Sequence, residues 1–265
     1  MTAIAVTIAG SDSGGGAGIQ ADLKTFSAMG VYGASVLTAL TAQNTLGVTA
    51  IHDVPANFIG AQLDAVFSDL QVNAVKIGML SQPETIETVT RGISKHGAGN
   101  VVLDPVMVAA SGDPLIADAA VSVLKTELFP HVALITPNLH EAARLLDQPV
   151  ADSKQAMRDQ AGELLRSGAQ AVLLKGGHDS GPEAADVLVT ETGVEWFTAP
   201  RHDTNNTHGT GCTLSSAIAA GLAKGLSLQA AVGAAKRYVT GAIKAADTLS
   251  IGKGHGPVHH FYSVW

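Results

Sequence analysis

The chain of 265 residues contains a single cysteine, and aromatic residues make up only 4% of it. The lone Cys212 cannot form an internal disulfide, which excludes a disulfide-stapled scaffold and favours a reducing, cytoplasmic location. Charged residues are also scarce at 15%, whereas hydrophobic residues reach 46% and glycine occurs 29 times. This balance excludes a disordered chain and a coiled coil, and it favours one folded globular unit.

The chain lacks the features that mark nucleic-acid or membrane partners. It has 16 Lys and Arg against 23 Asp and Glu, a net charge of -7, and no basic cluster, so no nucleic-acid partner is expected. The first ten residues carry no basic segment, and we expect no signal peptide. The longest uncharged run, residues 25–51, is broken by glycines, Gln43 and Asn44, so it makes a poor membrane span.

Several common catalytic motifs are missing. Neither the P-loop pattern G-x-x-x-x-G-K-S/T nor the hydrolase pattern G-x-S-x-G occurs, and the histidines lack the spacing of a zinc site. The segment GAGIQA at residues 16–21 fits a loose dinucleotide fingerprint. No acidic residue between Asp22 and Asp53 could hold the ribose, which argues against a dinucleotide oxidoreductase.

Short apolar runs alternate with longer segments of helical spacing. Continuous apolar runs suit strands that are buried on both faces, so the pattern predicts an α/β fold with a parallel sheet between helices. Two later runs flank a Glu-Thr-Gly turn and predict a hairpin, and the last long segment predicts two helices. No linker or repeat is present, so we expect one domain over residues 1–265. The expected strands are 3–9, 36–41, 75–77, 101–103, 132–135, 171–174, 187–189 and 194–198; the expected helices are 19–29, 55–68 and two within 211–248, separated near 225–227.

Two glycine clusters stand out. GSDSGGGAG at residues 10–18 follows an expected strand and predicts a loop whose backbone can approach a small ligand. NNTHGTGCT at residues 205–213 runs into a helix of small residues. The unpaired N–H groups of such a helix start bind anions, and Gly209 and Gly211 would allow a phosphate close approach. The alternative is an ordinary helix capped by Thr207 or Thr210.

Cys212 falls in the first turn of that expected helix. The field of the helix start predicts a thiol pKa below its usual value of about 8.5. The alternative is a small buried residue without chemistry.

Polar side chains follow three expected strands at one edge of the sheet. Lys175 ends one strand, Asp104 ends another, and Asn138 with Glu141 follows a third. Ligands of open α/β sheets bind at this edge, and carboxylates there suit Mg²⁺ held mainly through water. The alternatives are a surface role for Lys175 and, for Glu141, a first-turn acid that favours its helix dipole.

An ordered set of motifs resembles the bacterial hydroxymethylpyrimidine and phosphomethylpyrimidine kinases of thiamine biosynthesis. Each motif is weak alone, but together they span nearly the whole chain in order. They are IAGSDSGGGAGIQADLKTF at 8–26, TAQNT at 41–45, KIGML at 76–80, DPVM at 104–107, TPN at 136–138 with Glu141, LKGGH at 174–178, NTHGTGCT at 206–213 and GHGPVHHF at 254–261.

The resemblance implies a ribokinase-like, three-layer fold, a homodimer, and ATP with Mg²⁺. It implies phosphorylation of 4-amino-5-hydroxymethyl-2-methylpyrimidine and then of its monophosphate to the diphosphate. The implied roles are a hydrogen bond to the pyrimidine from Gln43; a pocket lined by Gly10, Asp22, Met79 and Val106; ATP or phosphate contacts from Lys175, Asn138 and Thr210; an anion hole at Gly209 and Gly211; water-mediated Mg²⁺ binding at Asp104 and Glu141; and Cys212 in the place of the aspartate base of distant sugar kinases.

Other readings stay open at this point. A pyridoxal or pyridoxine kinase, or an enzyme with both activities, would also take a flat ring with a hydroxymethyl group. A vitamin-binding protein without catalysis is a second alternative, although the retained Lys175 and Asp104 argue against it. We hypothesise that Cys212 assists deprotonation of the substrate hydroxyl.

Overall fold

The computed structural model describes residues 1–108, 115–177, 181 and 183–265, so His178 of the LKGGH motif lies outside the described residues. The strands are β1 (Ile4–Asp12), β2 (Tyr32–Asn44), β3 (Gly47–Asp53), β4 (Ala74–Ile77), β5 (Val101–Leu103), β6 (Leu134–Ile135), β7 (Ala171–Lys175), β8 (Glu183–Thr190) and β9 (Gly193–Pro200). The α-helices are α1 (Gly18–Ala28), α2 (Ala56–Asp69), α3 (Pro83–Lys95), α4 (Asp118–Val123), α5 (Leu139–Leu146), α6 (Lys154–Arg166), α7 (Thr210–Ala223) and α8 (Leu228–Lys244).

The strands of the described residues form one nine-stranded sheet in the order β3-β2-β1-β4-β5-β6-β7-β8-β9. Strands β2, β1, β4, β5, β6 and β7 pair with their neighbours in parallel. The pairs β2–β3, β7–β8 and β8–β9 are antiparallel. The predicted parallel sheet and the predicted hairpin are therefore confirmed.

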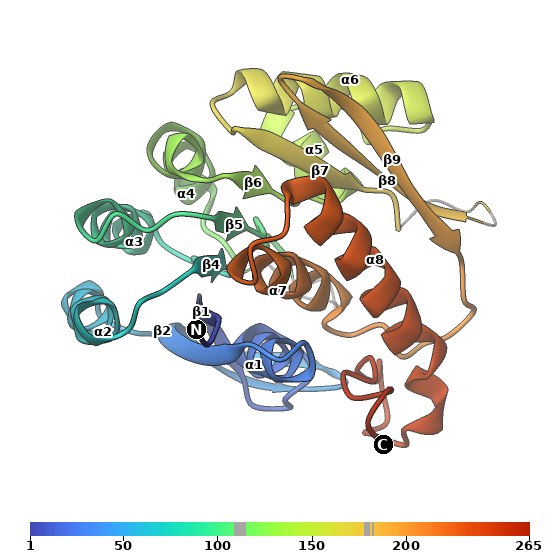
Figure 1. Ribbon diagram of the computed structural model, residues 1–265, viewed down its shortest axis with the longest axis horizontal. Coiled ribbons are helices and arrows are strands. Elements are labelled where there is room, and N and C mark those ends of the chain that lie inside the picture. The colour runs from blue at the N-terminus through green and yellow to red at the C-terminus, as the bar shows by residue number, and fades with distance from the viewer. Residues whose placement is uncertain (109–114, 178–180, 182) are drawn as a thin grey trace.

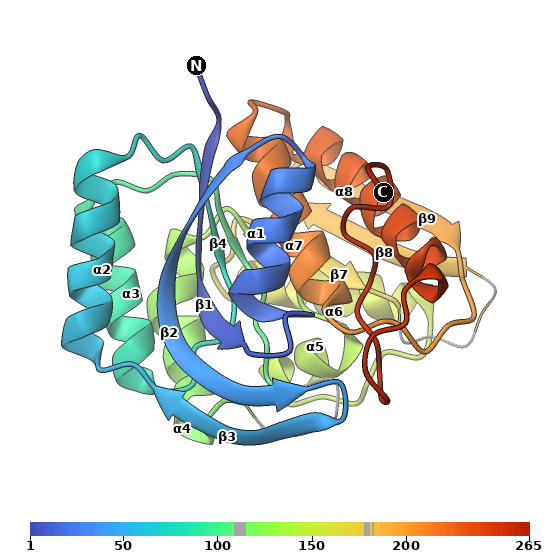
Figure 2. The same ribbon diagram turned by 90° about the horizontal axis from the view of Figure 1, so that it is seen from below.

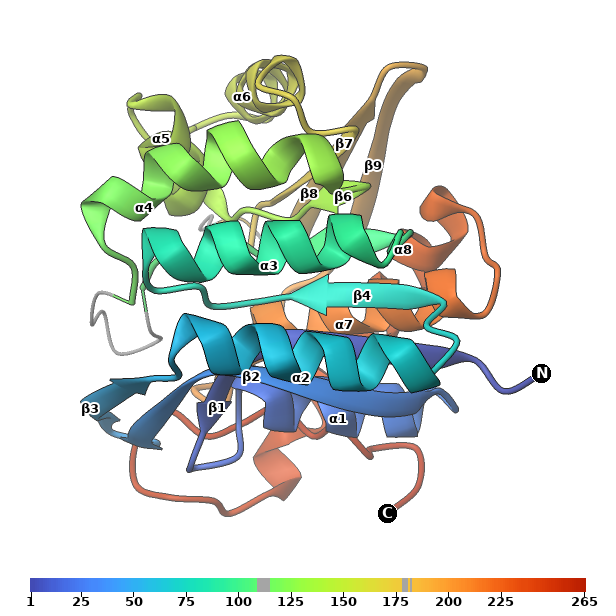
Figure 3. The same ribbon diagram turned by 90° about the vertical axis from the view of Figure 1, so that its left-hand side faces the viewer.

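Helices cover both faces of this sheet (Figure 1). Helices α2, α3, α4, α5 and α6 lie on one face, as Figure 3 shows, whereas α1, α7 and α8 cover the other. The position of β5 between two cores explains why all of its residues are apolar. Val101 and Leu103 belong to the core under α2 and α3, and Val102 belongs to the core under α7. Successive side chains of a strand point to opposite faces, so a doubly covered strand needs no polar position.

Helix α7 lies against the middle of the sheet, between α1 and α8 (Figure 2). Small residues make this close packing possible: a Cβ on Gly221 would lie 2.9 Å from the Cβ of Ala231 in α8. Helix α7 ends at Ala223 and α8 begins at Leu228, which confirms the predicted break. No helix in the described part of the chain combines the length and the apolar character needed to cross a membrane.

Candidate active site

A cavity of about 500 Å³ opens at the carboxyl ends of the parallel strands. This is the edge where open α/β sheets bind ligands. Strands β1, β2 and β4 deliver one wall, and the ends of β5, β6 and β7 together with the start of α7 deliver the other. Every site residue that the sequence indicates lines this cavity except Asp22: Gly10, Gln43, Met79, Asp104, Val106, Asn138, Glu141, Lys175, Gly209, Thr210, Gly211 and Cys212.

The N-terminus of α7 faces this cavity without a side-chain cap. The N-cap residue is Gly209, with φ +79°, and a Cβ there would lie 1.9 Å from the carbonyl oxygen of Gly16. Thr210 does not cap the helix, because its hydroxyl donates to the carbonyl of Thr207 at 2.6 Å. Within the described residues the amides of Gly211 and Cys212 accordingly have no hydrogen-bond acceptor. These free N–H groups are the feature that an anion site requires.

A positive charge lies beside these amides. Lys175 Nζ is 2.7 Å from Asp104 Oδ1 and 3.9 Å from Glu141 Oε2. Burial would lower the pKa of Lys175, but the charges of Asp104 and Glu141 outweigh it, so the pKa is raised and the amine stays charged. A Cβ on Gly211 would lie 3.4 Å from both Lys175 Nζ and Asp104 Oδ2. Glycine at this position leaves room for an anion between the amides and the lysine.

Glu141 combines both roles considered for it. Its carboxylate accepts the N–H of Asn138, whose side chain accepts the N–H of Glu141, so the pair forms a capping box at the start of α5. Its side chain also faces the cavity. Burial raises the pKa of Glu141 to about 7; Lys175 opposes this rise and Asp104 adds to it.

The carboxylates suit Mg²⁺ only in a water-mediated mode. No group of three or more His, Cys, Asp or Glu side chains in the described ranges could enclose a metal ion. Asp104 and Glu141 are two oxygen donors, and both already have protein partners. Mg²⁺ often keeps its waters and binds one or two carboxylates plus substrate phosphates, which is the mode that these residues fit.

The predicted low pKa of Cys212 is wrong. Burial raises the pKa of the thiol to about 11, and the charges of Asp22 and Asp104 add to this effect. The charge of Lys76 and a hydrogen bond from the amide of Gly18 act in the opposite direction but do not compensate. Cys212, in the first turn of α7, therefore carries a thiol and not a thiolate at neutral pH.

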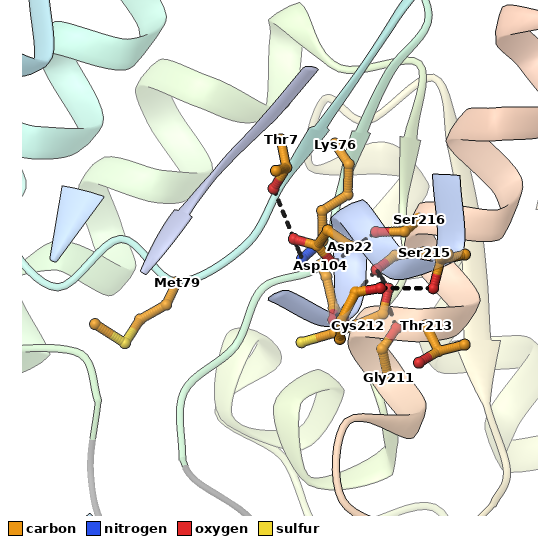
Figure 4. Close-up of polar contacts among 12 residues, drawn as sticks. Thr7, Asp22, Lys76, Met79, Asp104, Gly211, Cys212, Thr213, Ser215 and Ser216 are labelled. Atoms are coloured by element: carbon orange, nitrogen blue, oxygen red, sulfur yellow. Dashed lines mark hydrogen bonds and ion pairs between the residues drawn. The ribbon is translucent and has the colours of Figure 1, made fainter. Parts of the chain in front are cut away.

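The expectation that Asp22 lines the substrate pocket is also wrong. Asp22 is fully buried beneath the cavity and accepts hydrogen bonds from Thr7 at 2.6 Å, Lys76 at 2.9 Å and Ser216 at 2.6 Å (Figure 4). These partners belong to β1, β4 and α7. Asp22 thus fixes the first turns of α7 to the sheet and neutralises the fully buried Lys76. Lys76 was not among the residues to which the sequence pattern gave a role. A lone lysine within an apolar strand was the available signal.

The first glycine cluster is organised by its own aspartate. Asp12 Oδ1 accepts the amide of Gly14 at 2.8 Å, and Oδ2 accepts those of Gly16 and Ala17 at 3.0 and 2.8 Å. His208 Nε2 lies 2.9 Å from Oδ2. Burial would raise the pKa of Asp12, but these hydrogen bonds hold it below its usual value. The three amides are therefore satisfied within the loop. Gly10, Ser11, Asp12, Ala17 and Gly18 line the cavity, so the loop lies where its backbone can approach a small ligand, as predicted.

The opposite wall suits a flat ring. A Cβ on Gly10 would lie 3.3 Å from the terminal methyl group of Met79, so the absence of a side chain at Gly10 leaves the thioether exposed to the cavity. The side-chain amide of Gln43 donates to the hydroxyl of Thr41 at 3.3 Å, a weak bond that a ligand can replace. Gln43 offers both a donor and an acceptor to a heterocycle.

An uncapped helix start lies beside a charged lysine, at the carboxyl ends of the parallel strands. This fold and this site are those of an α/β phosphotransferase of small molecules. Comparison with known proteins specifies the family. A family model described as phosphomethylpyrimidine kinase matches residues 12–259. The chain belongs to this family and is a kinase.

Three relatives frame the similarity. Hydroxymethylpyrimidine/phosphomethylpyrimidine kinase of Rhizobium meliloti is 58% identical over 265 residues, covering 100% of this chain and 99% of the relative. Thiamine biosynthesis bifunctional protein ThiED of Geobacter sulfurreducens is 54% identical over 98% of this chain and 52% of its own length. The ADP complex of Bacillus subtilis pyridoxal kinase superposes with a TM-score of 0.91 at 37% identity, covering 98% of each chain.

The buried pair under α7 leads to a prediction on stability. Asp22→Asn leaves the ammonium of Lys76 buried without a carboxylate, so we expect a loss of about 3–5 kcal/mol in the free energy of unfolding, measured with urea. Glu87→Gln, at the exposed pair with Arg91, is the control and should leave stability almost unchanged. Equal losses in the two variants would contradict the assignment.

The single thiol allows a direct test of its ionisation. Because the pKa of Cys212 is raised to about 11, alkylation of the native protein by iodoacetamide should still accelerate about tenfold per pH unit between pH 8 and 10. Protein unfolded in urea should level off near pH 9. A native rate that reaches its plateau below pH 9 would show that the thiol is already ionised there.

Proposed function

We propose that the enzyme transfers the γ-phosphoryl group of ATP to 4-amino-5-hydroxymethyl-2-methylpyrimidine, and then phosphorylates the monophosphate to the diphosphate for thiamine synthesis. The observation that carries this proposal is the pair of free amides at Gly211 and Cys212 beside Lys175, in one cavity with Gln43 and Met79. The backbone amides and the charged Lys175 at one end of the cavity suit phosphates. The side-chain amide of Gln43 and the thioether of Met79 at the other end suit an aminopyrimidine.

The site is better equipped to stabilise charge than to remove a proton. Phosphoryl transfer passes through a loose transition state with charge on the equatorial oxygens, so positioned donors matter most. In this proposal the amides of Gly211 and Cys212 and the ammonium of Lys175 bind those oxygens, with Asn138 and Thr210 at the rim of the phosphate site. A monophosphate acceptor needs no deprotonation of an alcohol, so the same site can serve both steps.

We propose that Mg²⁺ binds through water to Asp104 and Glu141 and supplies neutralising charge to the phosphates of ATP. Asp104 stays oriented by Lys175, and also by Thr136, whose hydroxyl lies 3.2 Å from Oδ1. Cys212 is proposed to face the reacting hydroxyl. Because its thiol is protonated at neutral pH, any role as a base must strengthen with rising pH.

We further propose a cytoplasmic, single-domain enzyme that works as a homodimer. The lone cysteine supports the reducing location. Exposed apolar side chains on the β2–β3 hairpin and at the start of α2 support self-association: Leu40, Leu46, Ile51 and Phe58. Such groups on an edge hairpin are usually covered by a partner.

Product analysis tests the activity. With ATP and Mg²⁺, the pyrimidine alcohol should yield its monophosphate and diphosphate, and the pyrimidine monophosphate should yield the diphosphate, as measured by mass. A parallel incubation with pyridoxal tests the alternative substrate. Gln43→Ala should raise KM for both pyrimidine substrates about 5- to 50-fold, because it removes hydrogen bonds to the ring. Phosphorylation of pyridoxal alone would instead establish the alternative assignment. That substrate is included because the pyridoxal kinase of Bacillus subtilis is similar to this chain in fold and is 37% identical in sequence.

Substitutions at the helix start separate the two proposed contributions. Gly211→Asp places a carboxylate where the phosphate would bind, next to Asp104, and should lower kcat at least 100-fold. Gly99→Asp is the control, because no atom lies within 4 Å of its Cβ position. If Cys212 is the base, wild-type kcat still rises with pH at pH 10, because the pKa of the thiol is raised to about 11, and Cys212→Ala loses this rise. An unchanged profile in Cys212→Ala would remove the thiol from the mechanism.

A further inference from the structure

The segment 252–258, here called the strap, crosses between the two walls of the cavity. In Figure 2 the C-terminal chain passes the start of α7 and reaches the end of the β2–β3 hairpin. At the hairpin, the carbonyl of Thr45 accepts the amide of His255 at 2.9 Å, and its hydroxyl accepts the amides of Lys253 and Gly254, both at 3.1 Å. One threonine thus holds three consecutive backbone amides.

The other end of the strap pairs with the loop that enters α7. The amide of His208 donates to the carbonyl of Gly256 at 3.0 Å, and the amide of Val258 donates to the carbonyl of His208 at 3.4 Å. His208 directly precedes the N-cap Gly209. The strap therefore ends one residue from the proposed anion site.

Alternate glycines let the strap lie flat on both partners. A Cβ on Gly252 would lie 2.2 Å from the hydroxyl of Thr45, and one on Gly254 would lie 2.1 Å from its carbonyl oxygen. A Cβ on Gly256 would lie 2.0 Å from the amide oxygen of Asn206. Gly252 has a φ of +75° and residues 253–255 form a bend, so the strap is not a regular strand; a glycine at every second position from 252 to 256 provides the clearance that these contacts require. The sequence GKGHGP has this spacing at residues 252–257.

We propose that the strap is a positioning element of the kinase site, which sets the separation between the Gln43-bearing hairpin and the N-terminus of α7, with Thr45 as its anchor. The hairpin needs such a tie, because β3 is an edge strand with a neighbour on one side only. Gln43 lies two residues before Thr45, and His255 of the strap lines the cavity with Gln43 and Thr207. The inference rests on the proposed function, because it concerns the pyrimidine end of that site.

Steady-state kinetics of four variants test the proposal. Thr45→Ala removes the hydroxyl acceptor of two strap amides and should raise KM for the pyrimidine alcohol about 3- to 10-fold, with KM for ATP within about twofold of wild type. Thr45→Ser keeps the hydroxyl and should restore wild-type values. Thr49→Ala is the matched control on the same hairpin, because the hydroxyl of Thr49 donates to the carbonyl of Ala42 and not to the strap.

Gly254→Ala tests the close approach itself. Its Cβ would collide with the carbonyl of Thr45, a backbone atom that cannot turn away, so the strap must shift at both ends. We expect kcat/KM for the pyrimidine to fall at least tenfold, while amide exchange quickens at 253–255.

The outcomes separate the two proposals. Wild-type constants in Thr45→Ala and Gly254→Ala, with only a lower melting temperature, would show that the strap merely stabilises the fold. An inactive wild-type enzyme would overturn the proposed function. In that case protection of amides 253–255 by the bound pyrimidine alcohol, lost in Thr45→Ala, would still support the strap, and unchanged exchange would reject it.

Discussion

The fully buried carboxylate of Asp22 is the contact on which the site depends. It joins the hydroxyl of Ser216 in α7 to Thr7 in β1 and the ammonium of Lys76 in β4, with no exposure to solvent. A charge pair in such surroundings tolerates little displacement, since each partner would be costly to leave alone. Helix α7 is consequently held at one depth against the sheet, and its first turn reaches the cavity at the level of Lys175.

The two glycine clusters meet at the start of α7 and together shape it. Asp12 gathers the amides of the first cluster, and the compact loop that results presents the carbonyl of Gly16 to Gly209. That contact leaves no room for a capping side chain at the start of α7. A glycine N-cap costs a helix only about a few tenths of a kcal/mol relative to a Ser or Asp cap, and in the described chain it leaves the amides of Gly211 and Cys212 available to an anion. Stability is given up locally at the place where we propose that the phosphate binds.

The charges around the cavity suit transfer to an acceptor that is already anionic. Lys175 stays positive between Asp104 and Glu141, whereas Cys212 keeps its proton and Glu141 titrates near neutrality. A charged lysine beside two free amides, combined with a weak base, is a consistent arrangement for a loose transition state. It also explains why a thiol can stand at a position where an aspartate serves other kinases, as the family resemblance implies.

Much of the fold was predictable from local pattern. Apolar runs such as residues 101–103 indicate doubly covered strands, and the position of the break between α7 and α8 follows from Gly225 and Ser227, because periodicity and turn chemistry act over a few residues. The site was predictable at strand ends, where Asp104, Asn138 and Lys175 meet at one edge for topological reasons. Local pattern could not place Asp22, whose partners lie 15 to 194 residues away.

By itself, then, the sequence determined the alternation of strands and helices, the edge of the sheet at which the cavity lies and the glycine-rich helix start that faces it. These follow from short-range geometry and from the order of elements along the chain. Only the tertiary structure decided that Asp22 is structural, that Cys212 is a thiol of raised pKa, and that residues 252–258 join the two walls. Burial and pairing set those properties, and both depend on which distant segments the fold brings together.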